Sequence, residues 1–562
     1  MRIKSIYKKN KELYNSLLIN FSVLAFYLLF FYTRLETKND VFMKSIIEGT
    51  NSYGKSLAHI FFSDIIIGEI LCGAQSLIPG IPWYSVFHCL MCFICLTVIT
   101  YVLLRKNPRK TGVFPVIIIG VFIGYEAYCR INYFKTSMLL ICAAWVLFLY
   151  FCDRLISWYS WIWVYGLAFM SSLISFRMFS MGMICWLVLV TCFCIIERKI
   201  RSIWKFLIIF IIPVEIISSA CLYMDFRMYT GKPGWEYGGR YRQAIEKNIM
   251  YGYSPYEDGF GYDEGIENDY CYYNLAQGYL YNLDEQALDL ISEISEIPYE
   301  TSFDNIMLFF RRIPIGFLGQ FIFYAMAVLW MLLIYFKIPH KEIYIGMTGL
   351  GLLATAFPLF MMYAMGTSWI YVCVCFPYIL FTSFLFDNIE SKENRIIIVY
   401  FIIFMVIIYN RFSGRLYGAP LKNNYAEVAS EFEQGVVYIA DLRSYLGSMS
   451  PWTVYQRQMA VVPEFFIIDG IYGLIPDYYD SVLYDMNPED IRVAHYNVYL
   501  NRLRELYGWP YGDEETEVEF DENDKIDDED EKLEETDEEP EDQDEENEES
   551  EDIDETDVET DH

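Results

Sequence analysis

The stretch WYSVFHCLMCFICLTVITYVLL, residues 83–104, decides the fold class. It contains no Asp, Glu, Lys or Arg, and a helix needs about 20 such apolar residues to cross the hydrocarbon core of a bilayer. The basic segment Arg105–Lys110 follows it directly. Because Lys and Arg gather in cytoplasmic loops, the sequence predicts a transmembrane helix that ends on the cytoplasmic side.

Similar apolar runs occur along most of the chain and predict a mainly α-helical, polytopic membrane protein with about 11 spans. Tyr and Trp are frequent near the ends of these runs, as expected at membrane interfaces. The predicted spans are Ser16–Arg34, Trp83–Leu104, Val113–Tyr128, Thr136–Cys152, Trp158–Phe176, Met178–Ile196, Phe206–Tyr223, Ile313–Phe336, Ile343–Met365, Trp369–Phe386 and Ile396–Tyr409.

The stretch Leu57–Ile78 is also long enough to span, but it carries His59, Asp64, Glu69 and Gln75. Charges in the middle of a span are costly, so we expect an amphipathic helix lying at the interface. Counting it as a span would also place the basic segment after residue 104 outside the cell. We therefore predict a cell-membrane protein with a cytoplasmic N-terminus, an extracytoplasmic C-terminus and large outer loops at 35–82 and 225–312.

The predicted organisation has three parts: a transmembrane domain over 1–410, a small extracytoplasmic α+β domain over 411–512, and a tail over 513–562. Within the second part, Gly435–Ala440 and Glu464–Asp469 are strand-like, and Pro488–Leu506 is typical of a helix capped by Asn487. The tail has 32 Asp or Glu and 2 Lys, which accounts for nearly all of the chain's net charge of −32. Its like-charge repulsion and lack of apolar periodicity predict a solvated, disordered segment.

The cysteine and histidine content gives no metal-site signature. The chain has 14 Cys, mostly within apolar runs, and 5 scattered His, with no zinc-type spacing. We expect no nucleic-acid partner. The sequence requires no cofactor, although it leaves a divalent cation open.

The most informative acid is Asp40, in the loop that follows the first span. A loop carboxylate just outside the bilayer lies at the height where a lipid-phosphate-linked substrate presents its reactive carbon. There it could accept the proton of an attacking hydroxyl group. The alternative is that Asp40 is a solvated loop acid or caps a helix over Val41–Glu48.

Two motifs of this region, Asn39-Asp40-Val-Phe-Met43 and Pro79-Gly-Ile-Pro-Trp-Tyr84, resemble a group of bacterial surface-polysaccharide proteins within the GT-C superfamily of membrane glycosyltransferases. The stretches Tyr133–Ser137 and Gly265–Tyr270 extend the resemblance, which covers most of residues 1–508. Members often have an arginine near the outer end of the penultimate span, whereas Met365–Trp369 contains none. The resemblance implies a polyprenyl-phosphate sugar donor, a glycan acceptor and a catalytic acid at Asp40.

Arg177 and Lys135 are the candidate phosphate-binding residues. A guanidinium group forms two parallel hydrogen bonds to a phosphate, and Arg177 stands at an outer turn between two apolar spans. Lys135 and Arg130 are expected at the same depth. Their alternative role is ordinary snorkelling of a cation to the interface.

Four further residues are candidate substrate contacts. Asp64 and Glu69 could orient the acceptor or form the wet face of the interfacial helix. Asp269 could contact substrate or cap the helix that follows it. Trp235, with neighbouring Tyr residues, could stack on a sugar ring or simply pack the large loop.

The sequence thus favours a glycosyltransferase that moves a sugar from a polyprenyl-phosphate carrier to a cell-surface glycan or lipid-linked acceptor. A transporter or flippase of lipid-linked saccharides is the main alternative. It would place charges deep within spans and show discontinuous helices in paired repeats. A non-catalytic scaffold of polysaccharide assembly is the second alternative.

Overall fold

The computed structural model describes residues 11–49, 56–106, 113–152, 158–196, 206–231, 320–335, 368–385, 402–409, 437–441, 450–454, 465–468 and 491–493. It also describes isolated residues at 198–199, 204, 235, 307, 345–346 and 349. Contacts divide the chain into two units, Met1–Val518 and Glu519–His562, and all described residues belong to the first.

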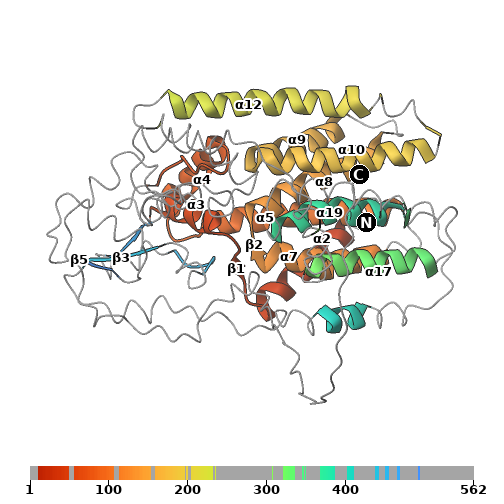
Figure 1. The fold of residues 1–562 in the computed structure, drawn as a ribbon, viewed down its shortest axis with the longest axis horizontal. Helices are drawn as coiled ribbons and strands as arrows, with labels where there is room; N and C mark the ends of the chain where they lie inside the picture. The colour runs from red at the N-terminus through yellow and green to blue at the C-terminus, as the bar shows by residue number, and fades with distance from the viewer. Residues whose placement is uncertain are drawn as a thin grey trace, which may run out of the picture. The chain divides into compact units, whose positions relative to one another are not determined.

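The first unit is mainly helical, and five of its described helices are long and apolar enough to cross a membrane. Figure 1 shows long helices running side by side, with the shorter helices α3 and α4 at one end of the bundle. The long helices and their shorter apolar companions are α2 (Lys11–Phe30), α5 (Trp83–Lys106), α6 (Val113–Ile118), α7 (Gly124–Tyr128), α8 (Tyr133–Phe151), α9 (Trp158–Ile174), α10 (Phe176–Ile196), α12 (Ile212–Thr230), α17 (Phe321–Tyr335) and α19 (Ser368–Leu385).

The predicted membrane-protein class is confirmed at this level: mainly α, with helices suited to a bilayer. Seven of the predicted spans coincide with described helices up to residue 230. The span predicted over Ile313–Phe336 is described as helix only over α17, and residues 402–409 form a helix within Ile396–Tyr409. The span predicted over Ile343–Met365 lies almost wholly outside the described residues.

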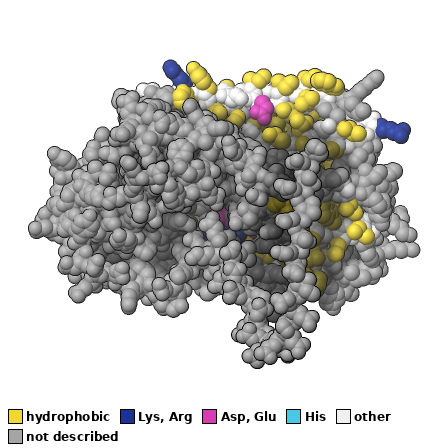
Figure 2. Space-filling model, viewed as in Figure 1, with side chains coloured by type: hydrophobic (Ala, Val, Ile, Leu, Met, Phe, Trp, Pro, Cys, Tyr) yellow, Lys and Arg dark blue, Asp and Glu magenta, His cyan; other side chains and the backbone are white. Residues whose placement is uncertain are grey.

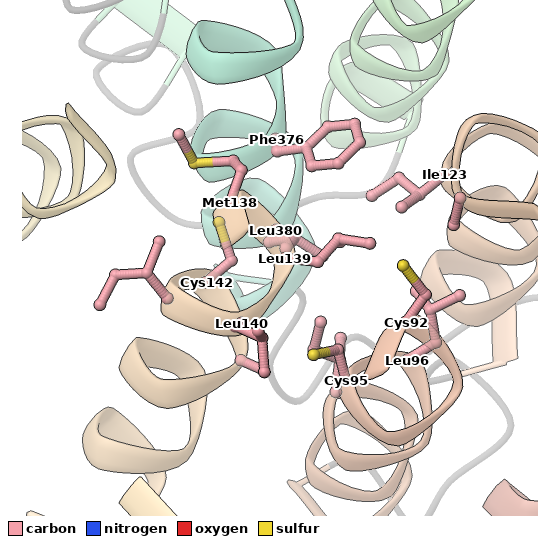
Figure 3. Packing of buried hydrophobic residues seen from close by; sticks show 14 of the residues in the cluster. Cys92, Cys95, Leu96, Ile123, Met138, Leu139, Leu140, Cys142, Phe376 and Leu380 are labelled. Carbon is pink, nitrogen blue, oxygen red and sulfur yellow. The ribbon is translucent and has the colours of Figure 1, made fainter. Parts of the chain in front are cut away.

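Helix α8 lies at the centre of the bundle. Cys142, Trp145 and Leu139 on it are fully buried. Figure 3 shows Met138, Leu139 and Cys142 packing toward Phe376 and Leu380 of α19, with Cys95 and Leu96 of α5 nearby. Burial of this apolar surface within a close-packed interior fixes the position of α8, which in turn positions the site at its N-terminus.

The outer surface of α12 is apolar. Ile212, Ile216, Tyr223 and Met224 are all more than 45% exposed. Figure 2 shows a band of hydrophobic side chains along the edge where α12 lies. Such a band is the surface expected of a helix in contact with lipid.

Two of the predicted spans contain a π-helical turn in the structure. The run Val113–Tyr128 divides into α6, the π-helix η2 (Ile119–Ile123) and α7, and η3 (Leu207–Ile211) precedes α12. Single π-helical turns within α-helices are often found beside functional sites. The η2 turn leads directly to Glu126, which is buried.

The prediction of one helix over Leu57–Ile78 is wrong in its first third. Helix α4 spans Ile65–Leu77, and residues before it form an irregular loop in which Phe61 has a positive φ of 54°. The backbone oxygen of Ala58 approaches Gly68 so closely that the loop and helix cannot form one straight cylinder. Hydropathy did not reveal this turn because most residues of the loop are apolar, like those of the helix that follows.

Three short strands form the C-terminal sheet. They are β3 (Val437–Asp441), β4 (Phe465–Ile468) and β5 (Ile491–Val493), in the order β4-β3-β5 and all parallel. The sheet pairs Tyr438 with Phe465 and Val437 with Ile491. The two predicted strands are confirmed, whereas the predicted helix Pro488–Leu506 is wrong where β5 lies. Pairing with β3 prevails there over the helical pattern, as tertiary context often does.

Candidate functional site

A second, two-stranded sheet builds the site. The strands β1 (Arg34–Leu35) and β2 (Arg130–Ile131) pair in parallel, with Arg34 opposite Arg130. The pairing continues beyond them, because the Glu36 N–H donates to the Ile131 carbonyl at 3.1 Å. These few bonds bring the start of α3 (Lys38–Glu48) beside the start of α8.

Asp40 lies at the third position of α3, in a capping box with Thr37. The Asp40 N–H donates to the Thr37 hydroxyl oxygen, and the Thr37 N–H donates to Asp40 Oδ2 at 3.2 Å. The Thr37 hydroxyl also donates to the same Oδ2 at 2.5 Å. One carboxylate oxygen therefore performs the capping role that the sequence analysis left open.

The other oxygen of Asp40 has partners from two different helices. The Tyr84 hydroxyl donates to Oδ1 at 2.7 Å, and the Tyr133 N–H donates to it at 3.0 Å. Tyr84 is in α5 and Tyr133 begins α8. A helix cap needs neither contact. The convergence of three elements on one carboxylate is the feature of the site that local sequence does not explain.

Burial raises the pKa of this carboxyl group. Asp40 is fully buried, and its desolvation raises its pKa to about 7, although the hydrogen bonds from Thr37, Tyr84 and Tyr133 oppose the rise. The nearby Glu36 carboxylate adds to the rise. A general base is most effective when its pKa lies near the working pH, so this carboxyl group is well matched to proton transfer near neutrality.

A buried ion cluster adjoins the site. Lys135 Nζ lies 2.5 Å from Glu36 Oε2 and 2.5 Å from Glu126 Oε2. Arg130 lies 3.6 Å from the other oxygen of Glu36. Burial acts against ionisation of Glu36, but Lys135 and Arg130 outweigh it and hold the pKa of that carboxyl group below its ordinary value. The sequence pattern pointed to the two cations but not to their pairing with Glu36 and Glu126.

A C-terminal segment closes one side of the site. The Ser85 hydroxyl donates to the Pro451 carbonyl at 2.7 Å, and the Trp452 indole N–H donates to the Thr33 hydroxyl. Lys44, one turn beyond Asp40 on α3, donates to the Thr453 carbonyl at 2.7 Å. Residues 450–454 are thus tied to α3, to α5 and to the link between α2 and β1, across more than 360 residues of sequence.

The other predicted substrate residues lie elsewhere. Asp64 is a buried N-cap of α4 whose Oδ1 accepts from the Ile66 N–H at 2.9 Å, so it is not on a wet helix face. Glu69 is exposed on α4, and Asp269 lies outside the described residues. Trp235 stacks on His59 with 3.9 Å between ring centroids, which is the packing role considered as the alternative to sugar stacking.

Arg177 is the second residue of α10 and is half-buried. Its neighbour Phe176 lines a small polar recess with Asp64, Ser218 and Asp225. The Ile65 N–H donates to Asp225 Oδ1 at 2.8 Å, so Asp225 shares the α4 N-terminus with Asp64. Sequence analysis placed Asp225 at the start of an outer loop, whereas it belongs to the last turns of α12.

Among the described residues no cluster of His, Cys, Asp and Glu is arranged to hold a metal ion. Comparisons with protein families, with curated proteins and with solved structures find no significant match to this chain. The function is therefore inferred from the geometry of the site itself.

Proposed function

We propose that the chain is a membrane glycosyltransferase that takes a sugar from a polyprenyl-phosphate donor and transfers it to a glycan or lipid-linked acceptor, with Asp40 as general base. The observation that carries the proposal is the Asp40 carboxylate, held by Thr37, Tyr84 and Tyr133 and poised near neutral pKa. The lipid-suited helices beside it support a substrate delivered from the bilayer.

In the proposed reaction, the acceptor hydroxyl attacks the anomeric carbon of the sugar while Asp40 accepts the hydroxyl proton. The new bond joins the acceptor oxygen to that carbon, and the bond from the carbon to the phosphate oxygen breaks. The polyprenyl phosphate leaves with the bonding electron pair. In this proposal Arg177 stabilises the departing phosphate, because guanidinium binds two phosphate oxygens at once.

The buried position of Asp40 implies that substrate entry rearranges the neighbourhood. In substrate-free structures catalytic groups are often not yet aligned, so burial does not argue against a base. The segment 450–454 borders the site and is held there by hydrogen bonds from Ser85 and Lys44. The proposal places the acceptor on this side, where hydroxyl and ammonium donors of Ser85 and Lys44 already bind carbonyl oxygens.

The test is an assay of purified protein in lipid nanodiscs with a panel of radiolabelled polyprenyl-phosphate hexoses, following release of free polyprenyl phosphate. Asp40→Asn keeps the shape of the side chain and removes the base, so release should fall by at least about a hundredfold. Arg177→Lys keeps the charge and should give an intermediate loss. Glu12→Gln makes the same carboxylate-to-amide change at the opposite end of α2 and should leave the rate unchanged.

Near-normal release by Asp40→Asn would remove the base assignment and leave Asp40 as a helix cap. Failure of the unaltered protein to release lipid phosphate from any donor, together with movement of the intact lipid-linked sugar across the bilayer, would favour the transporter. The η2 turn beside the buried Glu126 is the feature that most resembles a transporter helix.

A further inference from the structure

The bridge made by Lys135 is fully enclosed. Its side chain is 2% exposed, that of Glu126 is 2% exposed and that of Glu36 is 8% exposed. With Arg130, the ion-paired cluster contains two cations and two anions, and the charge of Arg34, opposite Arg130 in the β1–β2 pairing, also acts on Glu36. Such pairs are costly to bury and are retained where they fix a particular arrangement of the chain.

The bridge joins the two backbone segments that bind Asp40. Glu36 directly precedes Thr37, and Lys135 is two residues beyond Tyr133; Thr37 and Tyr133 both donate to the Asp40 carboxylate. The Asn132 side-chain amide also donates to Glu36 Oε2, at 3.2 Å. On the far side, Glu126 attaches the same ammonium to α7, immediately after the η2 turn.

This geometry argues against the phosphate-binding role considered for Lys135. Its ammonium already lies 2.5 Å from two carboxylates. A phosphate would have to displace one of them and approach the other at close range, where like charges in a buried setting repel strongly. The Lys135 ammonium is therefore better placed to bind Glu36 and Glu126 than to bind a phosphate ligand.

We propose that Lys135 and Glu36 are positioning residues for Asp40: the bridge from Glu36 through Lys135 to Glu126 keeps the N-termini of α3 and α8 in register around that carboxylate. This inference rests on the proposed function of Asp40. Hydrogen bonds weaken steeply with distance and angle, so a shift of about 1 Å between the two helix ends would break the contact of the Tyr133 N–H with Asp40.

The cluster also sets the electrostatic environment of Asp40. The groups facing that carboxylate are Glu36 from the β1–α3 link, Tyr84 from α5 and Tyr133 from α8, with His88 of α5 packed against Tyr84. The Lys135 ammonium lies just beyond and compensates Glu36. Removing Lys135 should therefore raise the pKa of Asp40, whereas neutralising Glu36 should lower it.

The experiment measures lipid-phosphate release against pH for Lys135→Met, Glu36→Gln and Lys135→Arg. Lys135→Met should move the acid limb of the pH–rate profile by roughly one unit toward higher pH, since a nearby charge shifts a pKa by about this much. Glu36→Gln should move the acid limb toward lower pH. Lys135→Arg keeps the charge and should stay close to the original profile. The KM for the donor should change less than about twofold in all three.

The double variant Lys135→Met/Glu126→Gln guards against misfolding, because it leaves Glu36 paired with Arg130 and no surplus buried carboxylate. It should show the same upward shift as Lys135→Met. A roughly tenfold rise in donor KM with an unshifted profile would overturn the proposal and make Lys135 a phosphate ligand. Equal profiles in all variants would overturn it as well.

A readout without activity separates this inference from the proposed function. The temperature of unfolding in detergent, followed against pH, reports the Asp40 titration whether or not sugar is transferred. The pH at which stability stops falling should move up in Lys135→Met and down in Glu36→Gln. If no donor is used but these shifts occur, the glycosyltransferase proposal fails while the positioning of Asp40 stands.

Discussion

Lys44 Nζ lies 2.7 Å from the carbonyl oxygen of Thr453 and 2.8 Å from Glu48 Oε2. One ammonium group thus joins helix α3 to a segment 409 residues later in the chain. Its side chain is almost fully buried, as is that of Glu48. Burial lowers the pKa of Lys44, although Glu48 acts to raise it.

Replacing Lys44 by Met should destabilise the protein by about 3–5 kcal/mol, because the Glu48 carboxylate then stays buried without its cation. Chemical denaturation in detergent, followed by tryptophan fluorescence, measures the loss. The double variant Lys44→Met/Glu48→Met removes both charges and should recover most of the stability. If the double variant is as unstable as the single one, the contact with Thr453, and not the buried charge, is what matters.

The raised pKa of Asp40 predicts that the free energy of unfolding depends on pH. The pKa of Asp40 is about 7 in the folded protein and about 3.8 when unfolded, so between these values the folded state binds a proton that the unfolded state does not. The contribution of Asp40 to the free energy of unfolding is therefore fully present below pH 4. It is lost as the pH rises toward 7, by roughly 1.4 kcal/mol per pH unit at most.

Asp40→Asn should remove this loss, because an amide does not ionise. The difference in unfolding free energy between the unaltered protein and the variant should fall from pH 4 to pH 7 and stay level above it. Thr37→Ala is not a suitable control, because it also removes a helix cap. A constant difference across this range would show that the carboxyl group ionises with an ordinary pKa.

The sequence predicted the mainly helical membrane class and singled out Asp40 as a candidate, and both predictions used local features of the chain. Apolar runs such as the one at 83–104 reveal membrane helices because length and hydropathy are properties of single segments. The partners of Asp40 are not local: Tyr84 and Tyr133 are 44 and 93 residues away. The pairing of β1 with β2 brings Tyr133 beside Asp40, and the packing of α5 against α3 and α8 brings Tyr84. No local propensity predicts a strand of two residues or these helix contacts.

The buried glutamates were missed for a related reason. Glu126 lies near the end of the predicted span Val113–Tyr128 and precedes Arg130 and Lys135, which were expected at the interface. Spacing alone does not show that Lys135 returns to meet Glu126 across the β2 link. A signal was present nonetheless: two acids and two bases at the ends of adjacent apolar runs suggest mutual pairing within a membrane protein.

The orientation of the helices remains a prediction from charge. Cysteines introduced in place of Gly54, Gly259 and Asp513 should react with a membrane-impermeant maleimide in intact cells, whereas cysteines at Asn107 and Ser391 should not. The basic segment at 105–110 underlies this expectation, because Lys and Arg favour the cytoplasmic side. Labelling at Asn107 would reverse the assignment of every span that follows it.

Removal of the acidic tail, 513–562, should leave membrane accumulation and thermal stability unchanged. The segment carries most of the negative charge of the chain and few apolar residues, so it can bury little surface on folding. Quantitative immunoblotting of membranes and thermal unfolding of the purified truncation measure the two quantities. A truncated chain that failed to accumulate would reveal a structural role for the tail.

Two glycines of α4 offer a matched test of the loop that distinguishes the structure from the sequence prediction. A Cβ added at Gly68 would lie 1.9 Å from the Ala58 carbonyl oxygen, which is backbone and cannot simply rotate away. Gly68→Ala should therefore displace the loop before α4 and destabilise the protein by several kcal/mol, as overpacking against backbone does. At Gly73 an added Cβ would meet nothing within 4 Å, and alanine favours a helix over glycine by up to about 1 kcal/mol. Gly73→Ala should thus be neutral or slightly stabilising in the same denaturation experiment. Equal effects of the two substitutions would mean that Leu57–Ile78 forms one continuous helix after all.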